Sequence, residues 1–142
     1  MTTPWHTFGL TLGGVALAGM LGCTLRFGLI TLIQTLTQTT PYLFKGGMGW
    51  QASAWGVLWV NLLGCAMAGV LMRWVAIGGV SPELKTVLQV GFLGGLTTFS
   101  SLITEYVALA HHYGYWHAMS LLYLLASIAL GTGAYLVCLK AG

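Results

Sequence analysis

The amino-acid sequence predicts an all-α integral membrane protein, with four transmembrane helices in a single domain, residues 1–142. Hydrophobic residues make up 57% of the chain and charged residues only 5%, and the mean hydropathy is +0.86. A soluble domain of this size needs more polar surface than that. Four apolar stretches reach the roughly 20 residues that a helix needs to cross a bilayer. These stretches are residues 8–33, 53–77, 84–109 and 116–139.

The first expected helix, residues 8–33, carries small residues at helical spacing and one arginine at depth. The small residues recur in two possible stripes, one with Gly9, Gly13 and Ala16 and the other with Gly14, Ala18 and Gly22. Such a stripe predicts close packing against another helix. The guanidinium of Arg26 either snorkels to the nearer interface or lines an aqueous vestibule that attracts anions.

The second expected helix, residues 53–77, places the amide of Asn61 at membrane depth. Burying an amide in hydrocarbon is costly unless it meets a hydrogen-bond partner or water. Asn61 therefore either bonds to a neighbouring helix or faces a polar path through the membrane. Gly64 and Ala68 on the same helix again predict close packing.

The third expected helix, residues 84–109, is predicted to be broken near its middle. Residues 91–101 (GFLGGLTTFSS) contain two adjacent glycines and two β-branched threonines. Non-helical backbone at membrane depth is tolerated only where protein or an ion satisfies the freed carbonyls, and broken helices are a recurrent way to build ion sites. The segment predicts an ion site, and the alternative is a Gly-Gly kink with no ligand.

The fourth expected helix, residues 116–139, gives an even number of spans, so both termini and residues 78–83 lie on one side. Arg73, Lys85 and Lys140 then oppose Lys45. This weak bias leaves the orientation poorly specified and permits insertion both ways round. Four helices also leave little room for an enclosed path, so a permeation path would require a second copy.

Several function classes are excluded by composition. A scattered net charge of +3 does not make a nucleic-acid surface. The chain has no Asp and only two Glu, so a nucleophile with a base and an orienting carboxylate is absent and the protein is not an enzyme. Two candidate groups have simpler explanations. The cysteines at 23, 65 and 138 are explained as small apolar packing residues, and the histidines at 111, 112 and 117 as loop residues without a closed set of metal ligands.

Three segments resemble the Fluc family of fluoride ion channels. Residues 22–27 (GCTLRF) are similar to the family's glycine-small-x-x-arginine-aromatic run. Residues 60–65 (VNLLGC) are similar to its second-helix asparagine motif, and residues 91–101 to its glycine-rich Thr-Thr-Phe-Ser break. The resemblance covers all four helices in order.

The resemblance implies a passive channel that exports fluoride across a bacterial inner membrane. It implies an antiparallel, dual-topology homodimer in the lipid bilayer, with two pores and a central sodium ion. The backbone carbonyls of Gly94 and Thr97 from both subunits would hold the sodium. The implied pore residues, with Arg26 in the vestibule, are Asn61, Phe99, Ser100, Ser101, Tyr123 and Ser127.

The chain departs from the family pattern at Leu102, where a second phenylalanine is usual. Either leucine replaces the ring sterically or one step of the path differs. Two other functions stay open. A small proton-coupled multidrug exporter needs a carboxylate within the membrane, for which Glu105 is the candidate. A non-conducting subunit of a heterodimer is favoured only by Leu102.

Overall fold

The computed structural model describes residues 4–39, 52–113 and 118–141. All secondary structure in these ranges is helical, and four helical stretches, Trp5–Thr37, Ala52–Ala76, Pro82–His111 and Ala118–Lys140, are long and apolar enough to cross a membrane. The predicted all-α class with four spans is confirmed. The elements in chain order are α1 (Pro4–Thr39), α3 (Ala52–Ala76), α4 (Pro82–Thr86), the π-helix η1 (Val87–Leu93), α5 (Gly94–Leu96), α6 (Phe99–Tyr113) and α7 (Ala118–Lys140).

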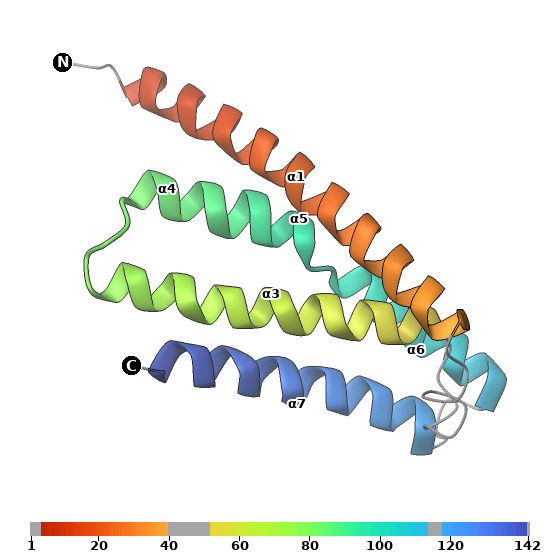
Figure 1. The fold of residues 1–142 in the computed structure, drawn as a ribbon. Coiled ribbons are helices and arrows are strands. Elements are labelled where there is room, and N and C mark those ends of the chain that lie inside the picture. The colour runs from red at the N-terminus through yellow and green to blue at the C-terminus, as the bar shows by residue number, and fades with distance from the viewer. Residues whose placement is uncertain (1–3, 40–51, 114–117, 142) are drawn as a thin grey trace.

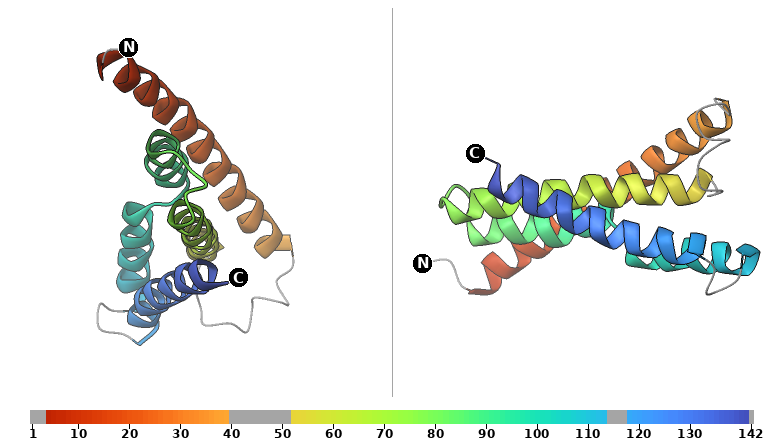
Figure 2. Two further views of the ribbon diagram at one scale, coloured as in Figure 1. Left: turned by 90° about the vertical axis from the view of Figure 1, so that its left-hand side faces the viewer. Right: turned by 90° about the horizontal axis from the view of Figure 1, so that it is seen from below.

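The four spans run alternately in opposite directions (Figure 1). Both chain ends and the α3–α4 connection lie at one end of the bundle. α3 lies centrally, between α1 and α7, while the third span packs its first half on α1 and its second half on α7. α1 crosses the other helices at an angle, as both views of Figure 2 show.

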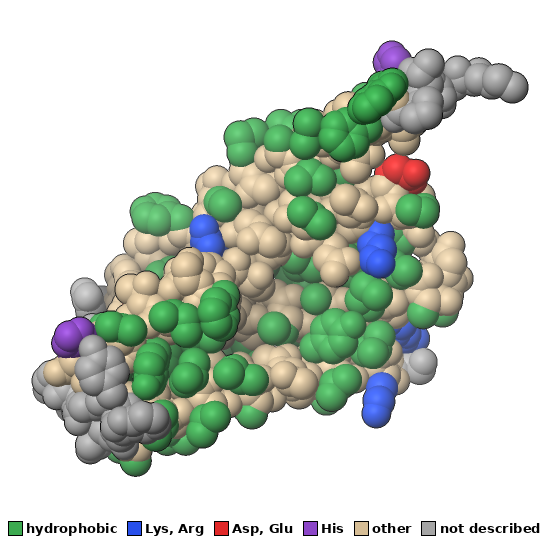
Figure 3. Space-filling view, turned by 180° about the vertical axis from the view of Figure 1, so that it is seen from behind, with side chains coloured by type: hydrophobic (Ala, Val, Ile, Leu, Met, Phe, Trp, Pro, Cys, Tyr) green, Lys and Arg blue, Asp and Glu red, His purple; other side chains and the backbone are tan. Residues whose placement is uncertain are grey.

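The surface of this single subunit carries many exposed hydrophobic side chains. The most hydrophobic windows of α1 and α7 are each only 11% buried. On the face drawn in Figure 3, hydrophobic side chains spread along the whole molecule and charged side chains are few. Such a surface requires lipid or another subunit around it.

The buried residues form two clusters on either side of the middle of the bundle. One cluster joins α3, α6 and α7, and its buried members are Ala54, Val57, Leu58, Leu102, Leu109 and Tyr123. The other joins α3 to the first half of the third span through Val60, Leu71, Leu93 and Leu96. The two halves of the third span therefore belong to different packing units.

Glycines let α1 approach the third span closely. A Cβ atom on Gly22 would clash with the carbonyl of Phe92 and lie 2.9 Å from the Leu96 nitrogen, and one on Gly95 would lie 2.5 Å from the Gly19 carbonyl. Gly9 and Gly13 have nothing within 4 Å of such an atom. Of the two stripes predicted on α1, the one that contains Gly22 is the packing face.

Candidate functional site

The candidate site is built around an interruption of the third span. α5 ends at Leu96, Thr97 is extended with φ −92° and ψ 153°, and α6 begins at Phe99. The sequence predicts a break over the two glycines and the two threonines; within it Gly94 and Gly95 are helical. Gly95 is instead needed for the close approach of α1, and the interruption lies at the two threonines.

The side chain of Asn61 on α3 satisfies the backbone at this interruption. The Thr98 N–H donates to Asn61 Oδ1 at 2.9 Å, and Asn61 Nδ2 donates back to the Thr98 carbonyl at 3.2 Å. The carboxamide thus replaces a peptide group, which is what non-helical backbone in a membrane needs. Of the two interpretations of Asn61, the hydrogen bond to a neighbouring segment is the one that forms. One hydrogen of its amide group remains available to another partner.

Thr98 in turn caps α6. Its hydroxyl oxygen accepts from the Ser101 N–H at 3.3 Å and lies 2.8 Å from the Ser100 hydroxyl. This is the arrangement of a threonine N-cap, which satisfies an N–H group of the first turn. α6 therefore begins at membrane depth, with the positive end of its dipole beside Asn61.

These bonds divert N–H groups from two helical carbonyls. In a continuous helix the Thr98 N–H would bond to the carbonyl of Gly94, and the Ser101 N–H to that of Thr97. Both N–H groups bond to side-chain oxygens instead. The carbonyls of Gly94 and Thr97 therefore lose the helical partners that an unbroken span would give them.

A cavity of about 450 Å³ lies beside the interruption, between α3, the third span and α7. Asn61, Phe99 and Ser127 line it together, although they come from three different helices. Leu102, which stands where the resemblance expects a second ring, also lines it. The other polar residues that line the cavity are Gln89, Thr97, Thr98 and Thr132.

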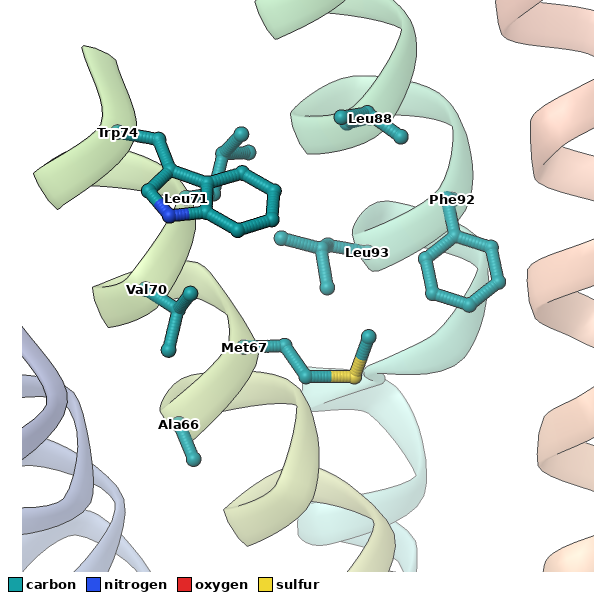
Figure 4. Close-up of a pocket in the computed structure, with 8 residues that line it drawn as sticks. All are labelled: Ala66, Met67, Val70, Leu71, Trp74, Leu88, Phe92 and Leu93. Carbon is teal, nitrogen blue, oxygen red and sulfur yellow. The ribbon is translucent and has the colours of Figure 1, made fainter. Parts of the chain in front are cut away.

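A second cavity, of about 460 Å³, lies between α3 and the first half of the third span. The side chains of Met67, Trp74 and Leu93 point into it, as Figure 4 shows, and the other lining residues are Phe92 and four aliphatic residues, Ala66, Val70, Leu71 and Leu88. No carboxamide or hydroxyl group is among its lining residues. An ion leaving water would find little here to replace its hydration, so the cavity beside Asn61 is the candidate path.

The other predicted site residues lie apart from the cavity lining. Tyr123 is fully buried in the cluster with Leu102 and Leu109. Ser100 and Ser101 lie in the first turn of α6, at the Thr98 cap. Arg26 is half-buried on α1, with its guanidinium 3.7 Å from Cys23 Sγ.

Glu105, the carboxylate that a proton-coupled exporter would need, accepts a hydrogen bond of 2.9 Å from the Ser53 hydroxyl. It is not among the residues that line the cavity. Lys45, one of the charges in the predicted orientation bias, lies outside the described residues. So does His117, one of the three histidines considered as metal ligands.

Sequence reasoning missed Gln89 and Thr98. Gln89 is a polar side chain inside a span, so the rule that singled out Asn61 would have found it. The role of Thr98 as cap and as partner of Asn61 depends on where α6 begins, for which the sequence alone has no sharp signal.

Comparison of the sequence with known proteins points to one family. Residues 14–139 match the model of the family described as CrcB-like protein, Camphor Resistance (CrcB). A protein of Thermus thermophilus named fluoride-specific ion channel FluC is 40% identical over 117 residues, which cover 82% of each chain. Proteins with the same name from Xanthomonas axonopodis pv. citri and Shewanella denitrificans are 39% identical over 94% of each chain and 36% identical over 82% of each chain, respectively.

Proposed function

The chain belongs to the CrcB family, and from this membership we propose that it forms a fluoride-specific ion channel, as its relatives are named. It is a multi-pass membrane protein and not an enzyme. The proposed location is the inner membrane of a bacterium, where the channel lets fluoride leave the cytoplasm. The observation that carries the proposal is the cavity that Asn61, Phe99 and Ser127 line beside the interrupted span.

The cavity offers what a small, strongly hydrated anion needs. Asn61 has one amide hydrogen beyond the bond to Thr98, and the edge of the Phe99 ring carries the positive part of its quadrupole. Phe99 is 72% exposed in the single subunit, so its ring is free to meet an ion. The Ser127 hydroxyl, which donates to the Tyr123 carbonyl at 2.7 Å, can rotate toward the cavity. Together these donors replace part of the hydration shell.

Sodium is the cofactor that we propose for the carbonyls of Gly94 and Thr97. Both carbonyls have lost their helical N–H partners to Asn61 and Thr98, and a hard cation prefers oxygen ligands. One subunit offers two such oxygens, so a full set takes two subunits. The ion would add positive charge near the interruption and would hold the unwound backbone of both copies.

We expect reconstituted protein to pass fluoride much faster than chloride. Chloride is larger than fluoride and binds hydrogen-bond donors less strongly. It therefore gains less than fluoride does from the donors that line a narrow path. Efflux of each anion from liposomes, followed with ion-selective electrodes, measures the ratio. Equal leak of both anions, or cation export driven by a proton gradient, would contradict the proposed function.

The partner that we propose is a second, antiparallel copy. The single subunit leaves most of α1 and α7 unburied, and the charge bias along the sequence is weak. In the structure the C-terminus and the α3–α4 connection lie at the same end of the bundle, which gives two independent reporters.

We therefore expect cysteines introduced as Gly79→Cys and Ala141→Cys, in a background without native cysteines, to react with an impermeant reagent from both sides of the membrane. Each reporter should label in comparable amounts in intact cells and in inverted vesicles. Labelling from one side only, at both positions, would rule out dual topology.

A further inference from the structure

Gln89 is a carboxamide on the third span that neither the packing nor the interruption uses. It lies seven residues after Pro82, the start of a span that continues to His111, and it is exposed in the single subunit. Among the described residues, no hydrogen bond to its side chain is formed. A polar side chain at such a position is costly in lipid and marks a functional contact by default.

The π-helix turns Gln89 toward the cavity. The Gly94 N–H bonds to the Gln89 carbonyl, which is the five-residue hydrogen bond of a π turn. In an α-helix, residues five apart point about 140° away from each other, whereas a π turn brings them onto one face. Gln89, Gly94 and Thr97 consequently line the same wall, and single π turns inside α-helices are frequent at functional sites.

The position of Gln89 along the cavity differs from that of Asn61. Along the chain, the third span begins after the α3–α4 connection, passes Gln89 and reaches the interruption at Thr97. Asn61 is fixed to Thr98 by two hydrogen bonds, so Gln89 is the carboxamide of the cavity that can reorient. The cavity therefore holds one fixed and one adjustable amide in sequence along its length.

We propose that Gln89 is a selectivity-determining residue of the pore, whose amide hydrogens bind fluoride on the side of Asn61 that faces the α3–α4 connection. This inference rests on the proposed channel function. An ion that enters from that end would exchange water for the Gln89 amide before it meets Asn61 and Phe99. Chloride, with its weaker demand for donors, would gain less from this contact.

The test compares Gln89→Met, Gln89→Asn and Gln89→Glu with Thr86→Val as the control. Met keeps the length of the side chain without donors, Asn keeps the amide on a shorter stem, and Glu keeps the shape with a negative charge. Thr86 is exposed one turn earlier, bonds only to the Pro82 carbonyl of its own helix among the described residues and does not line the cavity. Fluoride and chloride efflux and the size-exclusion profile are measured on each purified protein.

We expect Gln89→Met to lower fluoride efflux about tenfold or more, which is the effect of one lost hydrogen bond to a charged partner, and to lower the fluoride-to-chloride ratio. Gln89→Asn should restore part of the rate, Gln89→Glu should abolish it, and Thr86→Val should match wild type. All four should keep the wild-type assembly.

Two results would overturn the inference while the channel function stands. One is wild-type rate and selectivity in Gln89→Met. The other is loss of assembly in Gln89→Met together with normal selectivity in whatever flux is left, which would make Gln89 a contact between subunits. A wild-type protein that passes no fluoride would instead remove the proposed function, and this inference with it.

Discussion

Asn61→Asp should stop fluoride flux, and it is the substitution from which we expect the largest functional effect. The change keeps the size of the side chain but removes its amide hydrogens. An ionised aspartate would place a negative charge in the path of an anion and could no longer donate to the Thr98 carbonyl. A protonated aspartate could keep both bonds to Thr98, but it would have no further hydrogen to donate to the ion. We expect a loss of at least about a hundredfold, since a buried charge that repels the ion costs several kcal/mol.

The control for Asn61→Asp is Thr24→Val on α1. Thr24 is also polar within a span, but it is exposed and its hydroxyl bonds to the Met20 carbonyl of its own helix at 2.8 Å. We expect Thr24→Val to conduct like wild type. Efflux and size-exclusion profile are measured together, and a well-assembled Asn61→Asp protein with undiminished fluoride efflux would place the path elsewhere.

Gly22→Ala should destabilise the protein, whereas Gly13→Ala on the same helix should not. A methyl group on Gly22 would clash with the carbonyl of Phe92, a backbone atom that cannot give way, while one on Gly13 has nothing within 4 Å. Overpacking of this kind costs about 1 to 3 kcal/mol. Alanine is the better helix former by about 1 kcal/mol, so the effect at Gly13 should be neutral or slightly favourable.

The two variants and the wild type are heated in detergent, and the assembled protein that remains is measured by size exclusion. The quantity compared is the midpoint temperature of its loss. The expected result is a lower midpoint for Gly22→Ala and an equal or higher one for Gly13→Ala. Equal midpoints for the two variants would mean that the contact between α1 and the third span contributes little to stability.

The number of spans could be predicted from the sequence because hydropathy and length are local properties. The choice between the two stripes on α1 could not, since Gly13 and Gly22 are equally small and only the position of the third span separates them. The sequence predicts the interruption only as a segment that contains both the two glycines and the two threonines. The structure keeps Gly94 and Gly95 helical and unwinds at Thr97, where Asn61 can replace the lost backbone bonds.

The candidate site, like the fold, could be predicted from the sequence only in part. Asn61 could be singled out from its depth alone, but its hydrogen bonds to Thr98 depend on where the third span unwinds. The π turn that brings Gln89 into line with Gly94 shifts the helical register, whereas α-helical spacing would place Gln89 on another face. Tyr123 and Ser127 are one turn apart on α7, yet only Ser127 lines the cavity.

The division of the third span between two packing partners bears on how the protein is made. η1 and α5 pack on α1, which the ribosome has released earlier, whereas α6 packs chiefly on α7, which is synthesised last. Chains fold from the N-terminus as they emerge. The half of the span that carries Gln89 and Gly94 can therefore dock during translation, while the half that begins at Phe99 waits for the final helix. A chain truncated before α7 would insert its first helices normally and still lack one wall of the path.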